Sequence, residues 1–183
     1  MVGWRETEEK QMELFEAMAK RKSCRGYTAE KVSAEDVKKI VWAADSAPVG
    51  GAHYENIHLS VVQDDGVMGE IRKATGKGGN DPFYGAPLAV FVSAKARESS
   101  PNVEFANAAC IVEHMHLAAT ALGLGSVYIW GCLPAVKADA ALKTKLGIPE
   151  GFEPVSAIAV GHAADGAPEA RAFEGTYART ELL

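Results

Sequence analysis

Apolar residues recur along the chain with the spacings that distinguish helices from strands. Helical spacing predicts a first helix over residues 7–21, a second from Ser33 to about residue 45, and others over residues 66–74, 101–122 and 137–146. Ser33 followed by Asp36 resembles a capping box in which Asp replaces Glu or Gln. Gly123 stands where a left-handed cap would end the longest helix.

Short runs rich in Val, Ile and Leu predict four strands, over residues 57–62, 88–92, 127–130 and 155–160. The breaker sequence at residues 48–51 predicts a loop between the second helix and the first strand. Helices and strands do not alternate in a regular parallel pattern, so the predicted fold class is α+β, one sheet with helices packed on it. No repeat or linker divides the chain, and we expect one domain over residues 1–183, with a C-terminal tail from about residue 172.

Residues 117–136 carry no charge and are numerous enough to span a membrane. Glycines and a proline interrupt them, and the residue types change midway from Ala and Leu to Val, Tyr, Ile and Trp. A helix that ends at Gly123 and leads into a buried strand explains both features. The N-terminal residues lack the apolar stretch of a signal peptide, so the sequence predicts a cytoplasmic protein without a membrane partner.

The composition is that of a globular protein, with 183 residues of which 48% are hydrophobic and 23% charged. A net charge of −5 without an extended basic run argues against nucleic-acid binding. The three cysteines form no C-x-x-C pair and are expected to be reduced core residues. His114 and His116 should point to different sides of a helix, and Glu113 with His116 is a single Glu-x-x-His pair, so no metal site is expected.

The most informative segment is residues 21–27, Arg-Lys-Ser-Cys-Arg-Gly-Tyr, which places three cations and a hydroxyl at the end of a predicted helix. Arg offers a bidentate fork to phosphate and Ser adds a hydroxyl, so the segment could form an anion cradle. The same cations could instead be a solvated helix end that favours the C-terminal dipole. Composition alone does not separate these two interpretations.

The order of motifs along the chain decides between them. Beyond residues 21–27, the motifs are Ala47-Pro48 with its glycine-rich loop, residues 83–87 (Phe-Tyr-Gly-Ala-Pro), residues 117–131 from Leu-Ala-Ala through Gly-Leu-Gly-Ser to Tyr-Ile-Trp-Gly, and Val160-Gly161-His162 with Arg171 after it. Over roughly residues 12–175 this order resembles the nitroreductase family of FMN-dependent oxidoreductases in its short, single-domain form.

The resemblance implies a role for each matching residue. Arg21 and a C-terminal cation, matched here by Arg171, would hold the FMN phosphate, while Lys22 and Ser23 would contact the phosphate and ribityl chain. Arg25 would lie at the pyrimidine edge of the flavin, where reduction places negative charge that a fixed cation stabilises. Trp130 and Gly131 would end the strand whose backbone N–H points at flavin N5.

In the same family, residues matching Pro48, Val49 and Gly50 cover the flavin of the partner subunit. The sequence departs from the family pattern here, because residues 49–56 replace a Ser-x-x-Asn-x-Gln-Pro-Trp motif, so hydrogen bonds from this loop are expected from its backbone. His53 and Tyr54 are expected either near the substrate or at the dimer seam. His114 stands where relatives often have Asn.

The activity that the resemblance implies is electron transfer from NADH or NADPH to a nitroaromatic, a quinone or a similar small acceptor. Hydride transfer to flavin N5 needs no side-chain acid or base, so no catalytic residue is expected. We also expect ping-pong kinetics, because a single domain of 183 residues leaves no room for a separate nicotinamide-binding domain. The predicted helix over residues 101–122 is rich in small and apolar residues, which predicts a homodimer. The alternatives are an FMN store or sensor without turnover, and another reaction on the same fold.

Overall fold

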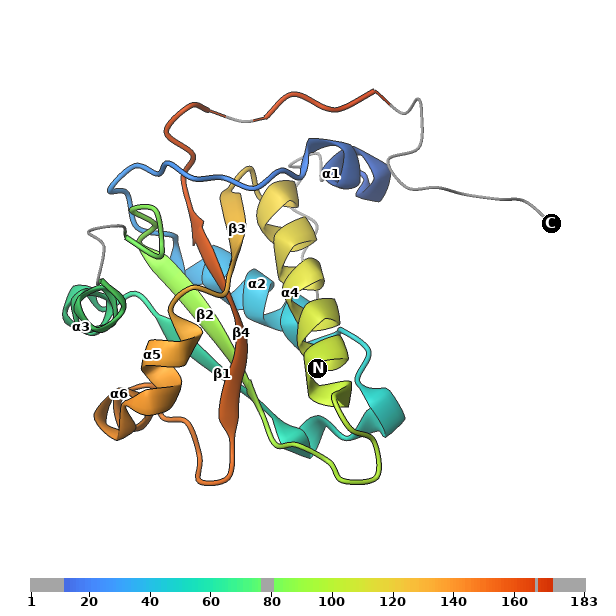
Figure 1. Ribbon diagram of the computed structural model, residues 1–183. Coiled ribbons are helices and arrows are strands. Elements are labelled where there is room, and N and C mark those ends of the chain that lie inside the picture. Colours follow the sequence, from blue (N-terminus) through green and yellow to red (C-terminus); the bar gives the residue numbers. More distant parts are fainter. Residues whose placement is uncertain (1–11, 77–80, 167, 173–183) are drawn as a thin grey trace.

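A sheet of four antiparallel strands lies at the centre of the structure, a computed structural model that describes residues 12–76, 81–166 and 168–172 (Figure 1). The strands are β1 (Ile57–Val62), β2 (Leu88–Ala94), β3 (Gly125–Ile129) and β4 (Glu153–Gly161), in the order β1-β2-β4-β3. β2 is buried along its whole length and β4 along nearly all of it, as expected for central strands with both faces covered. All four predicted strands are confirmed, and the α+β class with them.

Helices cover both faces of the sheet. α2 (Ala34–Asp45) and α4 (Val103–Ala121) pack on one face, while α3 (Asp65–Thr75), α5 (Leu133–Ala138) and α6 (Ala140–Lys145) pack on the other (Figure 1). Residues of β2 alternate between the two cores, so that Val90 and Val92 face α4 while Ala89 and Phe91 face α3 and α5. This alternation follows from the period of two along a strand.

The ends of the two longest helices agree with the sequence signals. The Ser33 hydroxyl accepts a hydrogen bond from the Asp36 backbone N–H at 3.0 Å, so Ser33 is the N-cap of α2. The second bond of a capping box is replaced, because the same hydroxyl donates to the Asp36 carboxylate at 2.7 Å. Gly123 follows α4 with φ +73°, the left-handed conformation that glycine adopts without strain.

Two helix predictions need comment. Of the first helix, predicted over residues 7–21, the described part is α1 (Leu14–Lys20), which Met12 and Glu13 precede; residues 7–11 lie outside the described chain. The single helix predicted over residues 137–146 is wrong. Asp139 breaks it with φ −110° and ψ 103°, because its carboxylate accepts hydrogen bonds from Ala141 and Leu142 and caps a new helix, α6.

The prediction of three core cysteines is also wrong for one of them. Cys132 is buried and Cys24 is half-buried, but Cys110 is exposed on α4. On this helix Ala108, Ile111 and Val112 take the face that meets the sheet, and position 110 falls on the opposite side.

Neither a membrane-spanning helix nor a metal-binding cluster is found in the described ranges. No helix there has the length and apolar character needed to cross a membrane. In the same ranges, no group of three His, Cys, Asp or Glu side chains is placed to hold a metal ion. The predicted tail from about residue 172 lies almost wholly outside the described residues.

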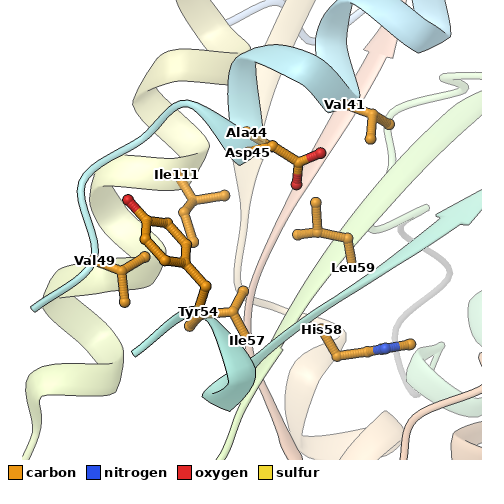
Figure 2. Close-up of a pocket in the computed structure, with 9 residues that line it drawn as sticks. All are labelled: Val41, Ala44, Asp45, Val49, Tyr54, Ile57, His58, Leu59 and Ile111. Atoms are coloured by element: carbon orange, nitrogen blue, oxygen red, sulfur yellow. The ribbon is translucent and has the colours of Figure 1, made fainter. Parts of the chain in front are cut away.

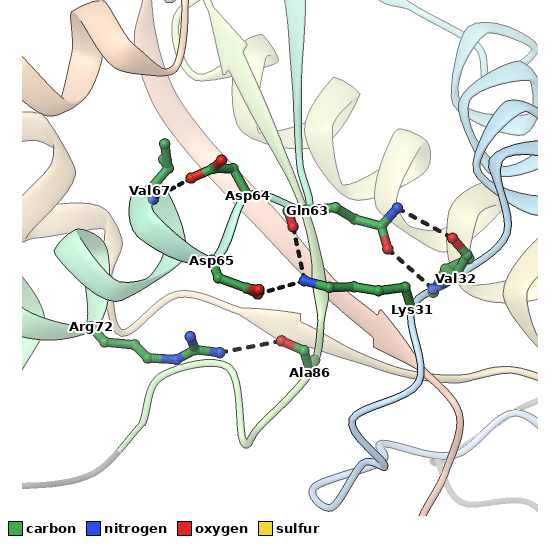
Figure 3. A network of polar contacts seen from close by, with 8 residues as sticks. All are labelled: Lys31, Val32, Gln63, Asp64, Asp65, Val67, Arg72 and Ala86. Atoms are coloured by element: carbon green, nitrogen blue, oxygen red, sulfur yellow. Dashed lines mark hydrogen bonds and ion pairs between the residues drawn. The ribbon is translucent and has the colours of Figure 1, made fainter.

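A polar network joins the segment before α2 to the helix α3 (Figure 3). The Lys31 ammonium donates to the Gln63 carbonyl at 3.0 Å and pairs with Asp65, and the Gln63 amide bonds both backbone groups of Val32. On the same helix Arg72 donates to the Ala86 carbonyl at 3.3 Å and pairs with Asp81 at 3.0 Å. The two Arg72 contacts hold the turn at residues 81–86 that leads into β2.

Candidate functional site

The cationic segment at residues 21–25 leaves the end of α1 and passes the end of the sheet where β3 begins and β4 ends. Arg21 ends the helix with ψ 118°, an extended value. Ser23 then pairs with Ser126 at the start of β3 in a parallel bridge, and the Cys24 N–H donates to the Ser126 carbonyl at 2.9 Å. Backbone bonds thus hold residues 23 and 24 of the segment against the start of β3.

Two glycines allow this close approach. A Cβ built on Gly125 would lie 2.8 Å from the Cys24 sulfur, and one on Gly161 would lie 2.6 Å from Cδ of Pro87 and 3.0 Å from the Tyr27 ring. The Tyr27 hydroxyl donates to the Cys24 carbonyl at 3.0 Å. Burial, and to a lesser degree the neighbouring Cys24, raise the pKa of Tyr27 well above its ordinary value, so this hydroxyl stays protonated and keeps its donor role.

The cations of the segment have no acidic partners among the described residues. Arg21 is half-buried, Lys22 and Arg25 are exposed, and none of the ion pairs in the described ranges includes any of the three. Ser23 is exposed beside them. Uncompensated positive charge with a hydroxyl on a fixed backbone is the donor set that a phosphate monoester requires. Residues 21–25 are therefore the candidate anion cradle, with donors of the kind that a phosphate group requires.

A buried histidine lies behind this cradle. His116 of α4 is 3% exposed, and its Nδ1 lies 2.7 Å from the Ser126 hydroxyl. Burial, and to a lesser degree the nearby charge of Arg21, lowers the pKa of His116 from 6.5 to about 4. The imidazole is therefore uncharged at neutral pH. Sequence reasoning considered His116 only as a metal ligand and missed this contact.

The C-terminal segment returns to the same end of the molecule, where it passes beside α1 (Figure 1). The Arg171 N–H donates to the Ala19 carbonyl at 3.0 Å, and its guanidinium donates to the Met18 carbonyl at 3.5 Å. The structure thus brings Arg171 to the helix that ends at Arg21. Its guanidinium contacts the helix carbonyls, as cations near a helix C-terminus commonly do.

Trp130 and Gly131 lie at the opposite end of β3. Trp130 is 58% exposed, and its indole N–H donates to the Val155 carbonyl at 3.0 Å, so this ring lies outside the core. A Cβ on Gly131 would meet open space. Ser126 and Trp130 are four positions apart along the chain, about 13 Å at the usual rise of a strand. An elongated ligand could therefore have an anionic end at the cradle and a flat ring near Gly131.

The structure does not bring residues 48–50 to the cradle within one chain. Val49 is buried in the core, and the Gly50 N–H donates to the amide oxygen of buried Asn107 at 2.9 Å. The Gly50 carbonyl accepts from Arg97 at 3.4 Å. Asn107 precedes His116 by nine residues of α4, which places these two residues about 14 Å apart along the helix.

A small cavity of about 270 Å³ lies behind that loop, between α2, β1 and α4 (Figure 2). Most of its lining is apolar, and the polar groups are Asp45, Tyr54 and His58, with the Tyr54 hydroxyl donating to the Ala47 carbonyl at 3.3 Å. His53 pairs with Glu55 at 2.8 Å, and this contact holds the pKa of Glu55 below its ordinary value. Neither His53 nor Tyr54 belongs to the cradle of its own chain.

Two more contacts were not foreseen from the sequence. The Arg25 guanidinium lies 5.8 Å from the centre of the Tyr84 ring, within the range of a cation–π contact. Tyr84 itself has φ +57°, an uncommon value for a residue other than glycine, in the turn that Asp81 holds through the backbone N–H groups of Phe83 and Gly85. His114 contacts the Cys110 carbonyl of its own helix at 2.9 Å.

Comparison with known proteins gives consistent matches. The family model described as "Nitroreductase family" matches residues 18–78 and 52–162. A curated relative from Archaeoglobus fulgidus, named "Putative NADH dehydrogenase/NAD(P)H nitroreductase", is 31% identical over 145 residues, which are 79% of this chain and 82% of the relative.

Solved structures agree with these matches. A Bacteroides fragilis nitroreductase with bound FMN is 28% identical with a TM-score of 0.78, over 94% of this chain and 100% of that one. A Desulfitobacterium hafniense nitroreductase with bound FMN has a TM-score of 0.80 at 23% identity, over 94% and 100% of the two chains, and supports the fold alone.

Proposed function

The chain belongs to the nitroreductase family of oxidoreductases, and we propose that it binds FMN and uses it to pass electrons from NADH or NADPH to a small electron-poor acceptor. The family resemblance seen in the motifs is confirmed. The observation that carries the proposal is the anion cradle, three cations without acidic partners in the described chain, held against the start of β3. Nitroaromatics and quinones are the acceptor classes we propose.

Each cation has a distinct role in this proposal. Arg21 and Lys22 bind the phosphate, and Ser23 donates its hydroxyl to the phosphate or the ribityl chain. Arg171 lies beside α1 and adds positive charge at the same end of the molecule. Arg25 lies at the pyrimidine edge of the ring and stabilises the negative charge that reduction places there. The Tyr84 ring limits the positions available to this guanidinium.

The end of β3 orients the ring. Gly131 carries no side chain and faces open space, so its backbone can approach a flat ring closely. The hydrogen bond from Trp130 to Val155 fixes the backbone at this point. When bound, FMN supplies the reversible uptake of two electrons and a proton. The protein side chains bind and orient, and none needs to act as an acid or base.

We further propose that the active molecule is a homodimer with two composite sites. The face of α4 turned away from the sheet exposes Phe105, Ala109 and Cys110, and Phe105 is 39% exposed. A second copy is the simplest cover for such a face on a helix that packs against the sheet with its other side. Residues 48–50, which lie away from the cradle of their own chain, then cover the ring held by the partner subunit.

The decisive experiment is reconstitution of the purified protein with FMN, followed by anaerobic addition of NADH or NADPH. Binding with a yellow colour that bleaches on addition of the nicotinamide supports the oxidoreductase proposal. Binding without bleaching would favour an FMN store or sensor, and failure to bind FMN would refute both.

The phosphate assignment has its own test. Arg21→Ala should weaken FMN binding roughly 10- to 150-fold, because it removes a charge-assisted contact of about 1.5–3 kcal/mol. Lys38→Ala is a matched control, since Lys38 is an exposed cation on α2 outside the cradle. Equal FMN retention by both variants after gel filtration would contradict the assignment of Arg21.

A further inference from the structure

His116 lies on the buried face of α4, where most of its neighbours are apolar. The adjacent buried residues Val112, Met115 and Ala119 are completely inaccessible to solvent, and His116 is 3% exposed. Burial of an imidazole without a hydrogen-bond partner is unfavourable, because the group loses its bonds to water. Its contact with Ser126 at 2.7 Å is therefore the feature that makes this position tolerable.

Ser126 connects this buried contact to the cradle. Its hydroxyl faces His116, its carbonyl accepts the Cys24 N–H at 2.9 Å, and it forms the bridge to Ser23. Ser126 is 2% exposed, so nothing but protein surrounds its side chain. A shift of its backbone would move Ser23 and Cys24 by the same backbone bonds.

We propose that His116 is a positioning residue for the anion cradle, acting through Ser126 to fix the backbone of residues 23–24 against β3. This role rests on the proposed binding of FMN at the cradle. Either direction of the hydrogen bond serves it, with the imidazole N–H donating to the hydroxyl or the hydroxyl donating to the imidazole. The contact joins three elements, α4, β3 and the segment after α1, at one point.

An uncharged imidazole suits this position for a second reason. The charge of Arg21 is close enough to disfavour a proton on His116, as burial does. An uncharged group behind the cradle leaves Arg21 free to approach a phosphate without a competing charge on its other side. A carboxylate in the same place would neutralise Arg21, and an ammonium would repel it.

The test compares the affinity for FMN with that for riboflavin, which has the same ring and ribityl chain and lacks the phosphate. His116→Phe fills the space and removes the hydrogen bond, and Ser126→Ala removes it from the other side. Each variant should raise the FMN dissociation constant about tenfold, the usual effect of one buried hydrogen bond, while changing riboflavin binding less than about twofold. The double variant should be no weaker than either single one, because both remove the same contact.

Two other variants control for general damage. His116→Gln keeps a neutral side chain that can bond the Ser126 hydroxyl, so it should retain FMN affinity within about threefold of the wild type. His58→Phe is the matched change on β1, where the imidazole packs against Phe152, and it should leave the FMN-to-riboflavin ratio unchanged. If His116→Phe does not fold, Ser126→Ala and His116→Gln carry the same comparison.

The outcomes separate the two proposals. Equal weakening of FMN and riboflavin, additive effects in the double variant, or wild-type FMN affinity in Ser126→Ala would overturn the positioning role alone. A wild-type protein that binds neither ligand would overturn the proposed function and this role with it.

Discussion

The stability of the protein should fall steeply in mildly acid solution because of one residue, His116. Its pKa is lowered from 6.5 to about 4 in the folded state, chiefly by burial and then by the charge of Arg21. An unfolded chain therefore takes up a proton at this position between pH 6.5 and 4, while the folded chain does not. Stability rises with pH wherever the unfolded state binds more protons, so this contribution is complete above pH 6.5 and is lost progressively below it.

The magnitude follows from linkage. Between pH 7.5 and 4.5 the unfolded imidazole becomes almost fully protonated and the folded one only partly, which amounts to about 2.5 kcal/mol of free energy of unfolding. Because native domains are stable by about 5–15 kcal/mol, the loss should be clear in a denaturant titration. His116 is almost fully buried, so solvent screening does not reduce the effect appreciably.

The assay is urea unfolding of the wild type and of His116→Gln at both pH values and one fixed protein concentration. Glutamine does not titrate, so the difference between the two proteins isolates His116 from the carboxylates that also titrate in acid. Among these, Glu55 and Asp65 have lowered pKa values through His53 and Lys31 and would be common to both proteins. The wild type should lose about 2.5 kcal/mol more than the variant. An equal loss in both would show that His116 is not held uncharged by its surroundings.

Three further predictions concern packing, assembly and kinetics. Gly161→Ala should lower the free energy of unfolding by about 1–3 kcal/mol, because the added Cβ overpacks against Pro87. Gly69→Ala is the control, since Gly69 is exposed on α3 and a Cβ there meets nothing within 4 Å. In the same thermal assay this control should be neutral or stabilising. Sedimentation should give twice the 19.4 kDa mass of one chain, and an FMN-retaining monomer would defeat the composite site. Double-reciprocal plots at several acceptor concentrations should be parallel, as ping-pong kinetics require, and intersecting lines would argue against one shared pocket.

Sequence patterns predicted the strands and the long helices because the helices repeat their core residues on one buried face and the central strands are short, continuous apolar runs. They failed at Asp139, where a single side chain competes with the helix for backbone donors and starts a new helix. They failed again at Cys110, because residue type alone does not say which side of α4 a small apolar residue occupies. Both errors concern choices that local hydrogen bonding or helix rotation decides, rather than the pattern of the segment as a whole.

The cradle could be proposed from sequence because its residues are contiguous, and Arg, Lys and Ser each carry a group that binds anions. The residues that support the cradle could not be predicted from the sequence. His116 and Ser126 are ten residues apart along the chain, and they meet only because the turn at Gly123 reverses the chain between α4 and β3. A histidine on an apolar helix gives no sign of its partner until the packing of helix on sheet is known.

Two of the buried polar residues of α4, Asn107 and His116, bear on the proposed composite dimer. Asn107 holds the Gly50 N–H near the beginning of the helix, and His116 contacts Ser126 of β3 near its end, so the helix holds the Gly50 loop and the start of β3 at its opposite ends. A ligand at the cradle of one chain therefore lies away from the Gly50 loop of that chain. In the proposed homodimer, two-fold association through the exposed face of α4 would bring each loop to the other cradle, since an isologous interface applies the same exchange to both copies. The separation of the site residues along α4 is thus itself an argument for the composite dimer.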